Sequence, residues 1–160
     1  IVPRHPKRIA DAVDPFKSHP YLLRSEVKFG DQAIDNQRVL FVDVMGELDL
    51  FYSIATVAVV GGSFSEDVQG HNPIEPAALG VPTLFGPYMK NFQVPAEILC
   101  HSGGAIQVDT LDELQECIAD LLLAPKKSSE MGKLGQAAVI ENRGAIQKTL
   151  ECLSPFIAAG

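Results

Sequence analysis

Residues 59–87 read VVGGSFSEDVQGHNPIEPAALGVPTLFGP, and this stretch decides the fold that we expect. It continues an apolar, β-branched run at 55–60 that stops at Gly61 and Gly62, followed by Ser63. Such a run ended by paired glycines predicts a buried strand that enters a tight loop. Glycines in that loop would let backbone N–H groups approach a ligand, since no Cβ intervenes.

The next signals predict a helix and then a second strand. Asn72 is a good N-cap, Pro73 suits the first helical position, and Glu75 follows, so we expect a helix over 73–79. A glycine and a proline end it, and residues 81–85 form the strand. Ligands of open α/β sheets bind beyond the carboxyl ends of the strands, which makes this loop a candidate site. Plain scaffolding stays an alternative, with Asn72 and Glu75 as a capping-box-like pair.

Strands and helices also alternate along the rest of the chain. Thr110 and Glu113 predict a capping box for one helix, and in another we expect Val94, Ile98 and Leu99 to face inward. The alternation predicts an α/β fold, a Rossmann-like parallel sheet with helices on both faces. The further expected strands are 27–29, 39–42 and 105–108, and the further expected helices are 7–16, 46–54, 91–101, 111–123, 125–142 and 145–156.

Composition excludes several classes of function. The 160 residues suffice for one domain with its own core, and the net charge is −7 without a Lys/Arg-rich block. We therefore expect no nucleic-acid surface and no patch for anionic membranes in this segment. No apolar run approaches the roughly 20 residues that span a bilayer. The chain starts on Ile1 and Val2, which read as the end of a strand, so we expect a piece of a longer protein.

Cysteines, histidines and glycine motifs give no sign of a cofactor. The three cysteines are widely spaced, and we expect free thiols in a reducing compartment. The histidines show no metal-ligand spacing, and no Ser/His/Asp or Cys/His nucleophile set is recognisable. Neither G-x-G-x-x-G nor G-x-x-x-x-G-K-[ST] occurs, which argues against a dinucleotide cofactor and excludes a P-loop. We thus predict no cofactor and no metal.

Several motifs together resemble the C-terminal donor-binding domain of Kdo transferases (3-deoxy-D-manno-octulosonic-acid transferases). The resemblance covers most of the chain, and the motifs come in the family's order. It implies the C-terminal half of a glycosyltransferase with two Rossmann-like domains (GT-B type), and residues 1–160 would be a single domain that binds the nucleotide sugar. The motifs are P-R-H-P at 3–6, M-G-E-L at 45–48, G-G-S at 61–63, G-H-N-P-x-E-P-A at 70–77, G-x-P-x-L-F-G-P at 80–87 and N-F at 91–92.

The resemblance also implies a set of CMP contacts. Glu75 would accept the hydroxyls of a ribose, and Arg4 would hold a phosphate, as a guanidinium can do with two hydrogen bonds. No residue of this chain is predicted to be catalytic, because the family's catalytic glutamate lies in an N-terminal domain that this chain lacks. The implied contacts are Pro3, Arg4, Met45, Gly46, Glu47, Asn72, Pro73, Ile74 and Glu75, with possible loop contacts from Gly61, Gly62, Ser63 and His71.

The chain departs from the family pattern at two places. Val44 stands where the family usually has Thr, which removes one possible hydroxyl contact, and Gln69 stands where the family tends to have Gly. The loop before Asn72 is also one residue longer. For His71 we favour a structural or substrate-orienting role over that of a general base. Without the resemblance, Arg4 reads as a solvated surface residue and Glu47 as a partner of a helix dipole.

The resemblance predicts the function of the whole enzyme as well. It would transfer Kdo from CMP-Kdo to a lipid A precursor at the cytoplasmic face of the inner membrane of Gram-negative bacteria, in lipopolysaccharide biosynthesis. Contacts with the acceptor and the membrane would belong mainly to the N-terminal domain. One alternative is the UDP-sugar-binding domain of another GT-B transferase or an epimerase. A second is a non-catalytic module that binds a nucleotide or another protein.

Overall fold

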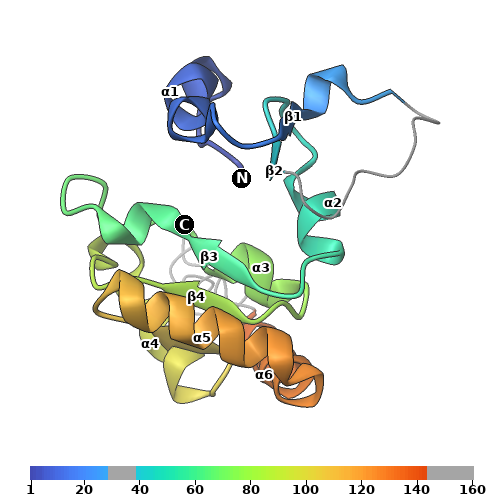
Figure 1. The fold of residues 1–160 in the computed structure, drawn as a ribbon. Coiled ribbons are helices and arrows are strands. Elements are labelled where there is room, and N and C mark those ends of the chain that lie inside the picture. The colour runs from blue at the N-terminus through green and yellow to red at the C-terminus, as the bar shows by residue number, and fades with distance from the viewer. Residues whose placement is uncertain (29–38, 144–160) are drawn as a thin grey trace, which may run out of the picture. The chain divides into compact units, whose positions relative to one another are not determined.

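The computed structural model describes residues 1–28 and 39–143, and the chain divides into two compact units, Ile1–Phe51 and Tyr52–Gly160 (Figure 1). The first unit holds a short helical segment, two strands and the start of a further helix. The predicted helix at 7–16 is a succession of 3-10 and α turns with α1 at its centre. The elements are α1 (Ile9–Val13) between 3-10 helices at Pro6–Arg8 and Asp14–Phe16, β1 (Tyr21–Leu23), a 3-10 helix at Arg24–Glu26, β2 (Val39–Phe41) and α2 (Leu48–Ser53).

The strands of the first unit are parallel. β1 pairs with β2 so that Leu23 lies opposite Phe41. On the other edge of β2, the amino group of Ile1 donates to the Leu40 carbonyl at 2.7 Å, and the Val42 N–H donates to the Ile1 carbonyl at 2.9 Å. Ile1 thus bonds to the residues before and after Phe41, which is the hydrogen-bond pattern of parallel strands. The strand-like start expected of the chain is therefore present, and Ile1 runs in the same direction as β2.

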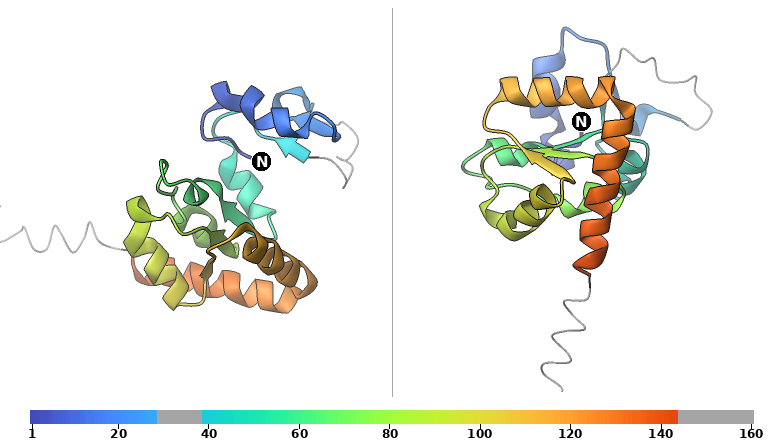
Figure 2. Two further views of the ribbon diagram at one scale, coloured as in Figure 1. Left: turned by 60° about the vertical axis from the view of Figure 1, so that its left-hand side comes forward. Right: turned by 90° about the horizontal axis from the view of Figure 1, so that it is seen from below.

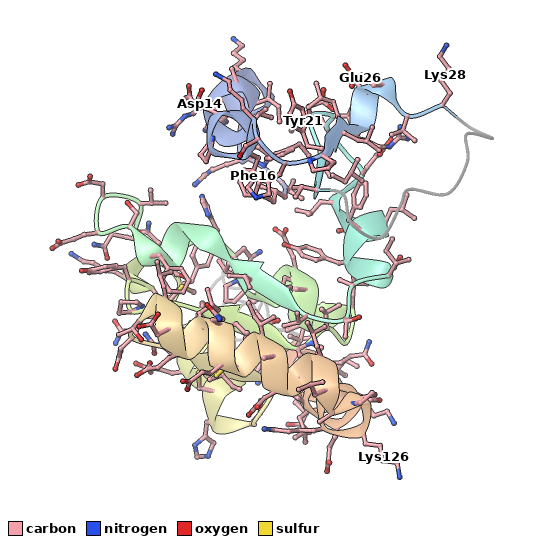
Figure 3. The ribbon with its side chains drawn as sticks, in the orientation of Figure 1. Asp14, Phe16, Tyr21, Glu26, Lys28 and Lys126 are labelled. Atoms are coloured by element: carbon pink, nitrogen blue, oxygen red, sulfur yellow. The ribbon has the colours of Figure 1, made fainter. Side chains whose placement is uncertain are left out.

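Aromatic rings form the core of the first unit. Phe41 is fully buried, and the rings of Phe16 and Tyr21 lie edge-on to it, with centroids 5.4 and 5.8 Å away. Figure 3 labels Phe16 and Tyr21. The prediction of a strand at 27–29 is wrong for its described part. The strand is β1, because the apolar run Tyr21–Leu23 is the segment that pairs in register with β2.

The second unit contains a parallel sheet in the order β3-β4-β5. Its elements confirm the predicted alternation, although each strand is shorter than predicted. β3 and β4 lack their first predicted residues, and β5 lacks its last. The predicted helix at 145–156 lies outside the described residues. The elements are β3 (Ala58–Val60), α3 (Ile74–Ala78), β4 (Thr83–Phe85), α4 (Gln93–His101), β5 (Ala105–Gln107), α5 (Leu111–Leu123) and α6 (Pro125–Glu141).

Helices cover both faces of this sheet, as predicted. Side chains alternate along β4, so Leu84 packs with Leu121 of α5 while Phe85 packs with Leu99 of α4 and Ala77 of α3. Figure 2 shows α5 and α4 on opposite sides of the strands. The two clusters make the sheet a fully covered central layer, which is typical of parallel sheets.

The local helix signals are confirmed in part. The α5 bounds are those predicted, and the Thr110 hydroxyl accepts the Glu113 N–H at 3.2 Å. The prediction that Val94 faces inward is wrong, since this side chain is 64% exposed. α4 packs against the core through Ala96 and Leu99, which lie three residues apart on one face, and Val94 lies on the solvent side of the first turn. Ile98 packs at the edge of the core.

The state of the cysteines and the apolar character of the helices complete the description. Cys100 and Cys117 are free thiols, as expected, and burial raises the pKa of the Cys100 thiol. Within residues 1–28 and 39–143, no helix combines the length and the apolar character needed to cross a membrane.

Candidate functional site

A buried serine joins the two loops that follow β3 and β4. Ser63 lies in a 3-10 helix directly after β3, and its hydroxyl donates to the Val60 carbonyl and accepts the Gly86 N–H at 2.6 Å. The Ser63 carbonyl accepts the Tyr88 N–H at 2.9 Å. The hydroxyl that we predicted as a possible loop contact is therefore used to hold the carboxyl ends of β3 and β4 together.

The glycine loop is closed by a histidine ring. A Cβ built on Gly62 would lie 2.2 Å from Nδ1 of His71 and 2.9 Å from a methyl group of Val68, so only glycine fits there. The Gly70 N–H also donates to the Gly62 carbonyl at 3.2 Å. His71 thus covers the loop as a half-buried packing element, and Gly62 is needed for close packing within the protein.

The loop before Asn72 has an unusual backbone conformation at Gln69. Gln69 has a φ of +57°, in the left-handed region that favours glycine. Asn91 braces this turn, because its N–H donates to the Gln69 carbonyl at 3.2 Å and its side-chain amide donates to the Val68 carbonyl at 3.1 Å. Gln69 therefore carries backbone strain that a glycine would not have.

Asn72 and Glu75 meet at the start of α3. The Asn72 side-chain oxygen accepts the Ile74 N–H at 3.1 Å, and its amide nitrogen donates to Oε1 of Glu75, also at 3.1 Å. Oε2 of Glu75 has no hydrogen bond to a described residue, and the side chain is exposed. The predicted capping position is wrong by one residue, because Pro73 is the N-cap, α3 begins at Ile74, and no side chain caps the helix from the N-cap position. Asn72 instead forms a turn with the first helical N–H and orients a carboxylate that keeps one oxygen for a ligand.

The rest of this helix start is fixed by packing. Pro73 is fully buried, and α6 lies against α3, where the Gln136 side chain donates to the Ala78 carbonyl at 3.0 Å. Ile74 is partly exposed beside Glu75. A rigid helix therefore carries the Glu75 carboxylate, which suits a residue that must hold a ligand in one orientation.

In the first unit, the predicted contacts follow the carboxyl ends of parallel backbone segments. Arg4 comes shortly after Ile1, which pairs with β2, and Met45 and Gly46 come after β2 itself. Arg4 is exposed and makes no hydrogen bond or ion pair with another residue of the described chain, and Pro3 beside it is half-buried. Met45 is 77% exposed, and Gly46 has a φ of +84°. This edge of the first unit therefore presents a free guanidinium and an open loop.

The Glu47 carboxylate, by contrast, already has a partner. Nε of Arg24 donates to Oε2 at 2.7 Å, and Nη2 of Arg24 donates to Oε1 at 3.0 Å. Nearby, the N–H and hydroxyl of Ser25 donate to the two oxygens of Asp43 at 2.9 and 2.6 Å. The Ser25 hydroxyl is the main reason why the pKa of Asp43 lies below its usual value.

Sequence reasoning missed Arg24, Ser25 and Asp43. A signal existed, because a basic residue follows β1 and two acidic residues follow β2. In a parallel pair these positions leave the sheet at the same end. The signal could be used only once β1 was placed at Tyr21–Leu23, and our predicted strand lay downstream of it.

Two other features bear on the chemistry of the site. An open depression of about 720 Å³ lies beside α1 and β1, with Ile9, Val13 and Tyr21 among its lining residues, and none of the predicted contacts lines it. The described residues contain no group of three or more His, Cys, Asp or Glu side chains arranged to hold a metal ion.

Comparison with known proteins identifies relatives along nearly the whole chain. No known family profile matches it. Proteins named 3-deoxy-D-manno-octulosonic acid transferase are similar to 98% of the chain, at 34% identity in Haemophilus influenzae, 30% in Rickettsia felis and 32% in Chlamydia trachomatis. The chain spans only 34 to 36% of the length of these relatives.

A solved structure supports the same relationship in three dimensions. The crystal structure of the C-terminal CMP-Kdo binding domain of WaaA from Acinetobacter baumannii matches with a TM-score of 0.76 and 27% identity, covering 86% of this chain and 72% of that one. The resemblance found in the motifs is therefore present in both sequence and fold. By both measures, the chain belongs with the C-terminal domains of 3-deoxy-D-manno-octulosonic acid transferases.

Proposed function

We propose that residues 1–160 form the donor-binding part of a Kdo transferase and bind CMP-Kdo. The observation that carries the proposal is the Glu75 carboxylate, which is exposed after the glycine loop, oriented by Asn72, and hydrogen-bonded through only one oxygen. Its free oxygen can accept the hydroxyls of a ribose. The similarity to a solved CMP-Kdo binding domain favours a cytidine nucleotide as that ligand.

The other proposed contacts supply what the phosphate of CMP needs. The net charge of −7 opposes the binding of an anion, so a local cation must outweigh it. Arg4 is exposed at the carboxyl edge of the first unit and has no partner within the described residues, so its guanidinium can accommodate the phosphate. Met45 and Gly46 offer open backbone at the same edge.

We further propose that the complete enzyme transfers Kdo from CMP-Kdo to a lipid A precursor in lipopolysaccharide biosynthesis. The reaction would take place at the cytoplasmic face of the bacterial inner membrane. The catalytic base, the acceptor contacts and the membrane contacts would lie mainly in the N-terminal domain of such an enzyme. The proposal assigns no catalytic residue, cofactor or metal to residues 1–160.

Calorimetric titration with CMP, UMP and UDP tests the donor assignment. We expect saturable 1:1 binding of CMP and clearly weaker binding of both uridine nucleotides. Tighter binding of UDP would favour the alternative of a UDP-sugar transferase or epimerase. Absence of binding by any of the three nucleotides would favour a non-catalytic interaction module and would overturn the proposal.

A further inference from the structure

We infer that Arg24 is a positioning residue for the nucleotide site, and that Glu47 acts through Arg24 instead of contacting the ligand with its carboxylate. The inference rests on the proposed function, because the segment that Arg24 holds contains Met45, Gly46 and Glu47. It adds Arg24 to the site and changes the role of Glu47 from a ligand contact to a partner of Arg24. Its starting point is the bidentate contact between the Arg24 guanidinium and the Glu47 carboxylate.

The fold brings this pair together from two separate loops. Arg24 comes directly after β1, and Glu47 follows β2 by a short loop. Because the strands are parallel and Leu23 lies opposite Phe41, both loops leave the sheet at the same end. The pair is only about 30% exposed on either side, so water screens it less than it screens a surface ion pair.

The guanidinium is fixed on its own side as well. Nη1 of Arg24 donates to the Val27 carbonyl at 3.1 Å, which ties the side chain to the turn that carries it. Two parallel bonds to one carboxylate then define the orientation of Glu47, as expected for a bidentate pair. Arg24 therefore acts as a rigid brace between the two loops.

A second tie holds the other end of the same segment. The N–H and the hydroxyl of Ser25, the neighbour of Arg24, donate to both oxygens of Asp43. The segment 43–47 is thus anchored at its first and last residues by adjacent residues of one turn. Met45 and Gly46 lie between the anchors, with Met45 77% exposed. The two ties present this short stretch of backbone outward in a defined conformation.

Electrostatics also argues against a direct contact between Glu47 and the nucleotide. Both carboxylate oxygens already accept hydrogen bonds from Arg24. An unpaired carboxylate beside a phosphate would repel it, whereas a paired one contributes little net charge. Arg24 thereby removes an unfavourable charge from the segment as well as fixing its shape. Glu75, which keeps a free oxygen, differs from Glu47 in this respect.

The test combines a mutant cycle with two readouts on the 160-residue chain. We would compare Arg24→Ala, Glu47→Ala, the double variant and the conservative Arg24→Lys. Arg8→Ala is the matched control, because Arg8 forms an exposed ion pair with Asp11 within one helical turn. Hydrogen exchange of the peptide covering 43–48 reports on the loop without any ligand. Calorimetry with CMP reports on the site.

We expect Arg24→Ala and Glu47→Ala each to speed exchange in this peptide and to weaken CMP binding by about tenfold, the size of one charge-assisted contact. The double variant should bind no more weakly than either single variant, since each removes the same brace. Arg24→Lys should restore part of the affinity, and Arg8→Ala should change neither readout.

Several results would overturn the inference, and they differ from a failure of the proposed function. Unchanged exchange in Arg24→Ala would show that the brace does not hold the loop. Faster exchange with unchanged CMP affinity would make it purely structural. If the double variant loses as much CMP affinity as the two single variants together, Glu47 contacts the ligand by itself. If the wild-type chain does not bind CMP, the proposed function fails first, and the positioning role falls with it whatever the exchange data show.

Discussion

Replacing Glu75 with Gln is expected to weaken CMP binding by roughly 10-fold or more. The amide is nearly isosteric, and its oxygen can still accept from the Asn72 amide, which Oε1 of Glu75 does now at 3.1 Å. What disappears is the charge on the oxygen that faces solvent. Hydrogen bonds to a charged group contribute about 1.5–3 kcal/mol, and about 1.4 kcal/mol corresponds to a factor of ten in affinity.

Loss of stability cannot account for an effect of this size. Removing a carboxylate near a helix start costs about 0.3–1 kcal/mol. A domain with a typical stability of about 5–15 kcal/mol stays almost completely folded after such a loss. A tenfold change in affinity, measured by calorimetry on a variant with a cooperative thermal transition, therefore reports on ligand contact.

Glu97→Gln is the matched control for this experiment. Glu97 is an exposed glutamate of the same unit, and its Oε1 accepts from the Gln93 side chain at 2.9 Å, much as Glu75 accepts from Asn72. It should leave CMP affinity unchanged. Equal affinity of Glu75→Gln and the wild type would refute the ribose contact and leave Glu75 with its hydrogen bond to Asn72 alone.

Four further outcomes are expected. Arg4→Ala should weaken CMP binding by about 1–3 kcal/mol more than it weakens cytidine binding, because cytidine lacks the phosphate; equal losses in calorimetry would remove Arg4 from the phosphate site. Gln69→Gly should raise the urea midpoint by the equivalent of about 0.5–1 kcal/mol, since relief of the positive φ outweighs the backbone entropy of glycine; a lower midpoint would contradict this. Because Ser25 lowers the pKa of Asp43 below 3.8, its carboxylate stabilises the folded state above that value and the stabilisation is lost as the pH falls through the folded-state pKa. Thermal melts should therefore show Asp43→Asn losing less stability than the wild type as the pH falls below 3.8, and parallel curves would argue against the contact. Residues 1–160 alone should form no product from CMP-Kdo and a lipid A precursor, and turnover above a blank in a product assay would place a catalytic base in this chain.

Local signals in the sequence predicted the second unit well. The capping residues Thr110 and Glu113 fixed the start of α5. The signal at Asn72 and Pro73 located α3 to within one residue, since the helix begins at Ile74 with Pro73 as its N-cap. Such signals depend on residues within one helical turn, so they can be read from the sequence without knowing the fold. The two faces of the sheet followed from the alternation of strands and helices, since a parallel sheet must be covered on both sides.

Features that depend on distant pairing were not predictable in the same way. β1 is a three-residue strand that exists through its register with β2, and the sequence between them is polar. The brace between Arg24 and Glu47 spans 23 positions and depends on that register. The exposure of Val94 depends on which side of α4 packs against the sheet, and this is the side of Ala96 and Leu99. A sequence with apolar residues on more than one side of a helix does not decide between them.

The most direct test of the nucleotide site is a titration of the isotope-labelled chain with CMP, followed by amide NMR shifts. We predict that the largest saturable shifts map to Arg4, to Met45 and Gly46, and to Asn72, Ile74 and Glu75. Smaller shifts are expected for Arg24 and Glu47, which would position the loop without contacting the ligand through their side chains. Shifts confined to the depression beside α1 and β1, or absent at saturating CMP, would contradict the central claim.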